Sequence, residues 1–403
     1  MNIAVAQSGG PTCAINASFV GVYEEAVKHA EIDTVFGSVN GIEGIINGNL
    51  IDLKKSPLSA EDLDMICQTP STVLGSCRYK LPADENSDVY EKILNCFVKN
   101  DIGCFFYIGG NDSMDTVAKL SKYFSERGHN IRVIGVPKTI DNDLLYTDHT
   151  PGFGSAAKYV ATSLREIVRD SEVYDLSSVT IVEIMGRHAG WLTASSCVLH
   201  SLGEAAPHLI YVPEAEFSMR KFLNDVNEAR QKYQSVMIAV SEGMKISPEE
   251  FGSSAVSERT DAFGHQYLGG IGKILENITR NEFGCKVRSI ELNVLQRCAS
   301  HIASLTDLQE SRAIGSAAVQ HALNGESGKM MCFSRVSDKP YKVEITTADA
   351  HLIANSEKFL PKEWLNEEQN NITDAALDYF LPLIEGEPAL KYENGLPCQY
   401  KFK

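Results

Sequence analysis

Short apolar runs alternate along the chain with longer segments in which apolar residues recur every three or four positions. The short runs predict buried strands, and the longer segments predict amphipathic helices. In the first half of the chain the expected strands cover residues 3–6, 34–39, 104–108 and 131–136. Strands and helices that alternate in this way predict a mostly parallel sheet with helices on both faces.

The alternation restarts after residue 170, where apolar runs at 179–184, 208–212 and 236–240 predict further strands. This second set is smaller than the first. We therefore expect an α/β protein with two doubly wound, mostly parallel-sheet domains and the functional site between them. A segment rich in Ser, Glu and Gly at 245–272 predicts an exposed connection within the second domain.

The first domain is expected to comprise residues 1–152 plus about 296–335, where the chain returns to it. The second domain is expected to comprise residues 153–295 plus about 336–366. Residues 367–403 form a C-terminal extension to which the pattern assigns no role.

Glycine-containing turns connect three of the expected strands in the first domain to the helical pattern that follows each of them. Gly9-Gly10 and Gly109-Gly110 each stand between an apolar run and a helical pattern, and Gly152-Phe-Gly154 opens a third helix. A strand, a glycine turn and a helix together make an anion-binding geometry, because backbone N–H groups and the helix N-terminus face the ligand. One such turn also ends strands for structural reasons alone. Three in one domain favour a binding role.

The stretch at 137–155 carries the densest set of reactive side chains. Asp141 and Asp143 lie two residues apart, and Lys138 precedes them. One carboxylate in such a set takes a proton from a hydroxyl, and the cation neutralises a transferring phosphoryl group. The alternative is a solvated Asp-Asn-Asp turn, which these residues also favour.

Six motifs stand in the order and approximate spacing found in the 6-phosphofructokinases. They are Gly-Gly-Asn-Asp-Ser (109–113), Pro-Lys-Thr-Ile-Asp-Asn-Asp (137–143), Thr-Pro-Gly-Phe (150–153), Glu-Ile-Met-Gly-Arg-His-Ala-Gly (183–190), Ser-Glu-Gly (241–243) and Leu-Gln-Arg (295–297). The chain resembles this family from its first strand to about residue 366, and most of all its pyrophosphate-dependent branch. The resemblance implies reversible phosphoryl transfer from pyrophosphate to the 1-hydroxyl of fructose 6-phosphate, with Mg²⁺.

The resemblance also implies a role for individual residues. Asp141 is expected to take the proton of the hydroxyl, with Lys138, Asp112, Thr139, Asp143 and Arg187 completing the catalytic set. The acceptor is expected to contact Thr139, Ile140, Asp141, Met185, Gly186, Arg187, Glu242, Arg288 and Arg297. The donor is expected to contact Gly9, Gly10, Arg78, Gly110 and Lys138, and the metal Asn111 and Asp112.

Two residues favour pyrophosphate over ATP as the donor. The ATP-using branch typically has Gly at the positions of Asp112 and Lys138. Here the carboxylate of Asp112 repels and fills the space of a nucleotide α-phosphate, while the Lys138 ammonium stabilises the leaving group. The remaining alternative is an ATP-dependent 6-phosphofructokinase.

Three positions depart from the family pattern. Asn111 stands where most relatives have a metal-binding Asp, and an amide is a weaker ligand for a hard cation. Val294 replaces a phosphate-contacting His, and Ser178 replaces an Arg that bridges subunits. The phosphate clamp is therefore expected to use Arg288 or Arg297, one of them reaching in from a neighbouring subunit of a homodimer or homotetramer.

Composition excludes several other functions. The net charge of −16 argues against nucleic acid or an anionic membrane as a partner. The N-terminus lacks a signal-peptide pattern, and no apolar run is long enough to span a bilayer. The 10 cysteines form no Cys-x-x-Cys pair, which favours a reduced, cytoplasmic protein.

Two other enzyme classes have weaker support. No Gly-x-x-x-x-Gly-Lys-Ser/Thr motif is present, so the chain is not a P-loop kinase. Residues 152–157 match a dinucleotide-binding fingerprint, but Asp-His-Thr-Pro precedes them in place of a strand. A dinucleotide-dependent oxidoreductase therefore explains only this one motif. A non-catalytic relative would be expected to lose Asp141 or Arg187, and both are present.

Overall fold

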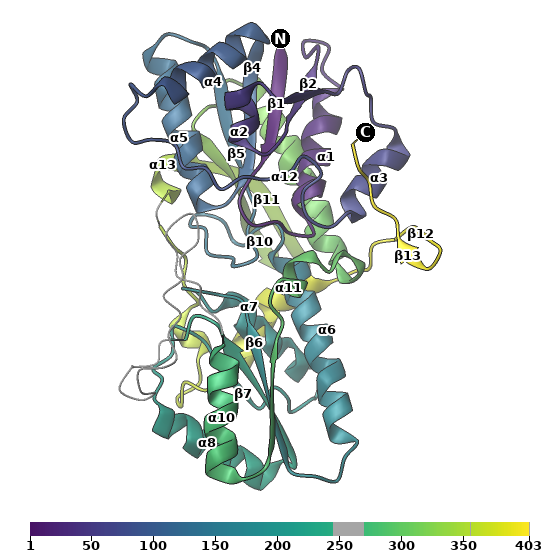
Figure 1. Cartoon of the computed structure of the whole chain (residues 1–403), viewed down its shortest axis with the longest axis vertical. Helices are drawn as coiled ribbons and strands as arrows, with labels where there is room; N and C mark the ends of the chain where they lie inside the picture. The colour runs from purple at the N-terminus through teal and green to yellow at the C-terminus, as the bar shows by residue number, and fades with distance from the viewer. Residues whose placement is uncertain (245–269, 355, 403) are drawn as a thin grey trace.

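The computed structural model describes residues 1–244, 270–354 and 356–402, arranged around two sheets one above the other (Figure 1). The upper sheet has seven strands in the order β11-β10-β5-β4-β1-β2-β3. They are β1 (Asn2–Gln7), β2 (Val35–Ser38), β3 (Leu50–Asp52), β4 (Ile102–Gly109), β5 (Arg132–Pro137), β10 (Lys329–Asp338) and β11 (Tyr341–Asp349). The four central strands and β10 run parallel, and the two edge strands are antiparallel to their neighbours.

Two layers of helices cover the upper sheet, as the alternating pattern predicts. One face packs on α1 (Ile15–Ala26), α3 (Ala60–Gln68) and α12 (Leu305–Leu323). The other packs on α2 (Ile42–Asn47), α4 (Asp88–Lys99), α5 (Asn111–Glu126) and α13 (Ala350–Ile353). Successive residues of β4 face opposite layers, with Phe106 in the first core and Phe105 in the second, so both faces of this strand are apolar.

The lower sheet has four parallel strands in the order β7-β8-β6-β9. They are β6 (Ser178–Ile184), β7 (Leu209–Tyr211), β8 (Ser235–Ser241) and β9 (Lys286–Glu291). One face packs on α8 (Met219–Lys232) and α10 (Ile271–Phe283). The other packs on α6 (Phe153–Glu172), α7 (Trp191–Ala194) and the 3₁₀ helix Ser195–Leu202. This confirms the expected α/β class with mostly parallel sheets.

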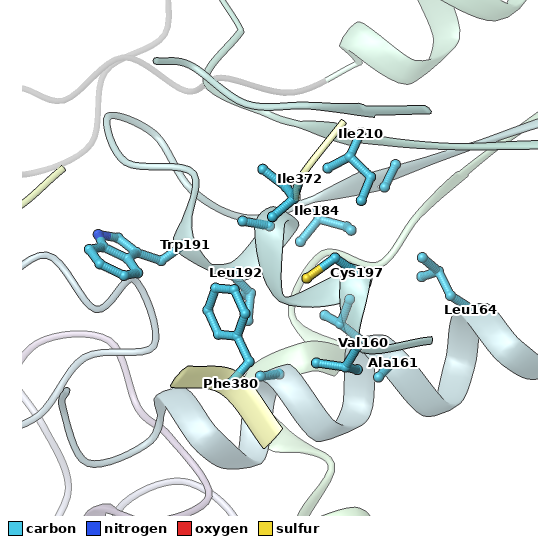
Figure 2. Close-up of a cluster of buried hydrophobic side chains, with 14 of the residues drawn as sticks. Val160, Ala161, Leu164, Ile184, Trp191, Leu192, Cys197, Ile210, Ile372 and Phe380 are labelled. Carbon is cyan, nitrogen blue, oxygen red and sulfur yellow. The ribbon is translucent and has the colours of Figure 1, made fainter. Parts of the chain in front are cut away.

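Part of the C-terminal extension packs in the core of the lower half, a role that no sequence pattern indicated. Ile372 and Phe380, the latter in α14 (Leu377–Phe380), lie in the core of the lower half beside Val160 of α6 and Leu192 of α7 (Figure 2). The remaining residues then cross to the upper half, where the hairpin β12 (Tyr392–Glu393) and β13 (Leu396–Pro397) and the C-terminus lie near α3 (Figure 1).

The path of the chain after residue 335 differs from the expected one. We expected residues 336–366 to return to the second domain, but β10 continues to Asp338 and pairs antiparallel with β11 up to Asp349. Because only two residues separate the strands, the second strand stays beside the first in the upper sheet. The chain leaves the upper half after α13. The connection expected at 245–272 lies, up to residue 269, outside the described residues.

Candidate active site

A cleft of about 840 Å³ lies between the two halves and is lined by residues of both. It lies at the carboxyl ends of β1, β4 and β5 in the upper sheet and of β6 and β8 in the lower sheet. The predicted site residues that line it are Gly9, Gly10, Arg78, Gly110, Asn111, Asp112, Lys138, Thr139, Ile140, Asp141, Asp143, Met185, Arg187, Glu242 and Arg297. Of the predicted residues, all of which the structure describes, Gly186 and Arg288 do not contribute to this lining.

Three loops of the upper half meet at one end of the cleft. Gly9 has a φ of +73°, which a residue with a β-carbon rarely adopts. Its N–H donates to the carbonyl of Cys77 at 3.0 Å, and its own carbonyl accepts from Ser76 Oγ at 2.7 Å. The carbonyl of Gly10 accepts from Lys138 Nζ at 2.6 Å. The loops after β1 and β5 and the loop that carries Arg78 are therefore bonded together.

This end of the cleft is rich in positive charge. Lys138 is 3% exposed, and burial lowers the pKa of its ammonium to about 8, with Arg297 and Arg78 acting in the same direction and Asp141 opposing them. A β-carbon on Gly10 would lie 3.2 Å from Nη1 of Arg297, so this guanidinium also approaches the backbone of the loop. Cations held this close to one another favour an anionic ligand between them.

The N-terminus of α5 points into the same end of the cleft. Gly110 is the N-cap, and Asn111 and Asp112 occupy the first turn. Helix N-termini favour negative charge, from a ligand or from a side chain such as Asp112. Lys80 Nζ lies 3.9 Å from Asp112 Oδ1. Asn111 Nδ2 donates to the carbonyl of Ser356 at 2.6 Å, which fixes the orientation of its amide.

The loop after β5 holds the candidate base. The N–H of Thr139 donates to the carbonyl of Pro151 at 3.2 Å, so the loop closes on itself. Thr139 Oγ1 accepts from the N–H of Asp141 at 3.1 Å. Between the two carboxylates Asn142 is fully buried at a φ of +56°, and its Nδ2 donates to the hydroxyl of Tyr379 at 2.8 Å. This turn directs Asp141 and Asp143 toward the cleft, which both of them line.

The two carboxylates differ in their surroundings. Burial raises the pKa of Asp141 above its usual range, although the nearby Arg187 and Lys138 cations act in the opposite direction. Burial, together with the charge of Asp141, raises the pKa of Asp143 to about 7. The cations thus favour the charged form of Asp141, whereas the charge of Asp141 favours the protonated form of Asp143.

The lower half contributes Arg187 and Glu242 from the loops after β6 and β8. Gly186 lies behind them at a φ of +140°, and a β-carbon there would lie 2.7 Å from the carbonyl oxygen of Ala189. The N–H of Gly186 donates to Glu242 Oε1 at 3.5 Å, and burial raises the pKa of this carboxyl to about 7. Gly186 therefore shapes the loop that carries Arg187 while its own atoms stay out of the cleft lining.

The two predicted phosphate-binding arginines face different places. Arg297 lines the cleft. Arg288 lies in a separate depression of about 400 Å³ with Tyr159 and Leu295, and its Nη1 is 3.5 Å from Asp170 Oδ2. Arg288 and Arg297 lie only nine positions apart in the sequence, but the structure does not bring both of them into the cleft of one chain.

A segment that carries no recognisable motif closes one side of the cleft. In this segment, residues 356–360, the N–H of Lys358 donates to the carbonyl of Asp143 at 2.7 Å. The carbonyl of Lys358 accepts from Trp191 Nε1 at 2.9 Å. The segment thus connects the loop that carries the two carboxylates with the start of α7, which follows the loop that carries Arg187.

Glu357 and Phe359 of this segment also line the cleft, together with His188. Glu357 Oε1 lies 2.5 Å from His188 Nδ1. His188 stands next to Arg187 in the motif at 183–190. No pattern pointed to residues 357 and 359, because they lie far along the chain from every other motif and reach the cleft only through folding.

The part of the chain that the structure describes contains no group of three or more His, Cys, Asp or Glu side chains arranged to hold a metal ion. Asn111 and Asp112 provide at most two ligands. Mg²⁺ is often held by one or two carboxylates together with water and substrate phosphates, so this sparse set fits that mode of binding.

None of the described helices is long and apolar enough to cross a membrane.

Comparison with known proteins decides the family. The family described as Phosphofructokinase matches residues 2–322. The chain belongs to the phosphofructokinase family. This membership confirms the resemblance drawn from the six motifs.

Individual members of the family bear more specific names. A pyrophosphate–fructose 6-phosphate 1-phosphotransferase from Xanthomonas campestris is 42% identical, and the match covers 100% of this chain and 96% of the relative. A sulfofructose kinase from Alkalicoccus urumqiensis is 33% identical over 92% of this chain and 93% of the relative. The crystal structure of a pyrophosphate-dependent phosphofructokinase from Marinobacter aquaeolei has a TM-score of 0.88 and 38% identity, covering 99% of this chain and 95% of that one.

Proposed function

We propose that the chain transfers a phosphoryl group reversibly from pyrophosphate to the 1-hydroxyl of fructose 6-phosphate. The observation that carries this proposal is that Asp112 and Lys138 lie at the anion-binding end of the cleft that also contains Asp141. The relatives whose names specify pyrophosphate, at 42% and 38% identity over nearly the whole chain, support the choice of donor.

The donor would bind at the cationic end of the cleft. Its phosphates would meet the backbone N–H groups of the glycine turns and the N-terminus of α5, together with the side chains of the loops. The residues proposed for this role are Gly9, Gly10, Arg78, Gly110 and Lys138. The Asp112 carboxylate stands where a longer, nucleotide-bearing donor would extend, so it disfavours ATP by charge and by volume.

The acceptor would bind against the lower half with its 1-hydroxyl directed at Asp141. That oxygen attacks the terminal phosphorus of pyrophosphate while its proton passes to the Asp141 carboxylate. The bond to the bridging oxygen breaks, and orthophosphate leaves toward Lys138. Asp143 and Thr139 hold the loop of Asp141 in place. The acceptor contacts proposed in addition are Thr139, Ile140, Met185, Gly186, Arg187, Glu242, Arg288 and Arg297.

Asn111 and Asp112 are the residues we propose to hold Mg²⁺ when it is bound with the donor. The ion would supply charge neutralisation for the phosphate oxygens. Because Asn111 Nδ2 donates to the carbonyl of Ser356, the Oδ1 of this residue is the atom that would bind the ion.

Assembly and location complete the proposal. Arg288 is directed away from the cleft of its own chain, which is consistent with a homodimer or homotetramer in which it serves a neighbouring subunit. All ten cysteines have free thiols, which favours the reducing environment of the cytoplasm.

Coupled steady-state assays with each donor test the proposed function. The purified chain, fructose 6-phosphate and Mg²⁺ are combined with pyrophosphate or with ATP, and formation of fructose 1,6-bisphosphate is followed through its conversion by auxiliary enzymes. We expect kcat/KM for pyrophosphate to exceed that for ATP by at least about 10²-fold. A preference for ATP would make the chain an ATP-dependent phosphofructokinase.

The acceptor is tested in the same assay. Because one relative is named a sulfofructose kinase, 6-deoxy-6-sulfofructose serves as the competing acceptor. A sulfonate carries one negative charge where a phosphate carries close to two, so arginine contacts discriminate between them. We expect fructose 6-phosphate to be preferred, and a preference for the sulfonate would replace the proposed acceptor.

A further inference from the structure

The last residues of the chain lie near α3 in the upper half (Figure 1), whereas Ile372 and Phe380 of the C-terminal extension pack in the lower core. Gln68, the last residue of α3, is 6% exposed. Its Oε1 accepts from the N–H of Lys391 at 2.9 Å, and its Nε2 donates to the carbonyls of Lys391 at 3.1 Å and Cys398 at 2.7 Å. This side chain therefore uses both its donors and its acceptor on the C-terminal residues.

The contact continues at the next residue. Thr69 Oγ1 accepts from the N–H of Tyr400 at 2.8 Å and donates to the carbonyl of Met65 at 2.7 Å. The ring of Phe402 meets that of Phe19 in α1 edge to face, with 6.5 Å between ring centroids. We call residues 391–402 the C-terminal brace. Its bonds are concentrated on the point where α3 ends.

The segment that begins at this point leads into the cleft. We call residues 69–78 the donor loop, because Arg78 at its end lines the cationic end of the cleft. The donor loop has no regular secondary structure, so no ladder of backbone bonds holds it. Asn16 bridges it, since its Nδ2 donates to the carbonyl of Thr69 at 2.8 Å and its Oδ1 accepts from the N–H of Val73 at 3.0 Å.

Further bonds reach the middle of the donor loop. The N–H of Leu74 donates to Gln7 Oε1 at 3.0 Å, and Gln7 Nε2 donates to Asn16 Oδ1 at 2.9 Å. Asn16 and Gln7 are both fully buried. Asn16 therefore links the first part of the donor loop to its middle.

We propose that the C-terminal brace positions Arg78 for the phosphoryl donor by fixing Gln68 and Thr69, where the donor loop begins. The brace is a positioning element and does not touch the substrates. The inference rests on the proposed function, since it assigns the donor to the end of the cleft where Arg78 lies. Misplacement of a binding group by about 1 Å costs about 10²-fold in rate, so loosening the start of the loop should weaken donor use specifically.

The variant Gln68→Met tests the proposal, because it keeps the size of the side chain and removes its three bonds to the brace. We expect KM for pyrophosphate to rise about tenfold while KM for fructose 6-phosphate stays within about twofold of wild type. Thr69→Val removes the acceptor of Tyr400 with little change of shape, and we expect the same direction with a smaller rise. It carries the test if Gln68→Met does not fold.

Two controls separate positioning from stability. Gln320→Met makes the same substitution on α12, where Gln320 bonds to Glu25 of α1 and not to the brace. Lys391→Ala removes an exposed ion pair with Glu61 and keeps the backbone bonds to Gln68. Both should leave both KM values unchanged.

The outcomes distinguish the possible failures. If Gln68→Met and Thr69→Val lower the melting temperature but leave KM for pyrophosphate unchanged, or raise both KM values equally, the brace has only a structural role and the proposal fails. If the wild type does not use pyrophosphate at all, the proposed function fails first.

Discussion

Lys138 Nζ donates to the carbonyl oxygen of Gly10 at 2.6 Å, so the residue that follows β5 closes onto the loop that follows β1. Burial lowers the pKa of this ammonium to about 8. At neutral pH the ammonium is still mostly protonated, and a bound phosphate would raise its pKa further. One side chain thus joins two phosphate-binding loops and supplies charge between them.

The first prediction concerns this ammonium. Lys138→Met should lower kcat/KM for pyrophosphate by about 10²- to 10³-fold, the usual loss of one preorganised electrostatic contact. In the wild type, KM for pyrophosphate should rise about fivefold between pH 8 and 9, as the protonated fraction falls through a pKa near 8. Lys138→Met measured over the same pH range reports the ionisation of pyrophosphate itself, and equal profiles for the two proteins would contradict the prediction.

The same group also affects stability in a definite direction. Its pKa is about 8 when folded and 10.5 as an ordinary lysine, so the unfolded chain binds more protons between these values. The free energy of unfolding of the wild type, relative to Lys138→Met, should therefore increase as pH rises from 8 toward 10.5. Denaturant titrations of the two proteins at several pH values measure this difference.

The second prediction separates the two carboxylates. Asp141→Asn should lower kcat by about 10²- to 10⁴-fold with a modest effect on KM, because a base acts mainly in the transition state. Asp143→Asn keeps a side chain of the same shape at a carboxyl whose pKa is raised to about 7, so its loss of kcat should be at least tenfold smaller. A kcat for Asp141→Asn above about half of wild type would remove this residue from the role.

The third prediction concerns donor choice. Asp112→Gly removes a carboxylate from the first turn of α5, so ATP should become a measurable donor while kcat/KM for pyrophosphate falls. Lys138→Gly should depress the pyrophosphate reaction without admitting ATP. Because the two residues adjoin one anion site, the double variant should not show the sum of the two effects. Continued exclusion of ATP by Asp112→Gly would show that another group blocks the nucleotide.

The fourth prediction concerns the acceptor. Arg187→Ala should raise KM for fructose 6-phosphate far more than KM for pyrophosphate, because a lost charged hydrogen bond costs about 1.5 to 3 kcal/mol. Arg297 approaches Gly10, so Arg297→Ala should raise both. Arg288→Ala should raise KM for fructose 6-phosphate only if the residue reaches a neighbouring cleft.

Mixed assemblies test the last point. Subunits with Arg288→Ala and subunits with Asp141→Asn, refolded or expressed together, should regain activity if Arg288 serves a neighbour, since some clefts then contain both intact residues. Failure to regain activity in proven mixed oligomers would assign Arg288 a structural role through its contact with Asp170.

Apolar periodicity predicted much of the fold. The apolar runs before Gly9, Gly109 and Lys138 became β1, β4 and β5, because a run buried on both faces has little alternative to a central parallel strand. The same logic placed the glycine turns and the carboxylates at one edge of the sheet, since carboxyl ends of parallel strands meet there. The six motifs were then sufficient to identify the family.

Only the tertiary structure decided the remaining features. Residues 336–349 stayed in the upper sheet because a two-residue turn keeps paired strands together. Arg288 stayed out of the cleft because it lies within β9 and not at its carboxyl end, and its side chain reaches Asp170 of α6. Glu357 reached the cleft, and Lys391 and Tyr400 reached the end of α3, through contacts between residues far apart along the chain. Sequence periodicity describes the face on which a residue lies within its own element, whereas such contacts depend on how separate elements pack, and no local pattern contains that information.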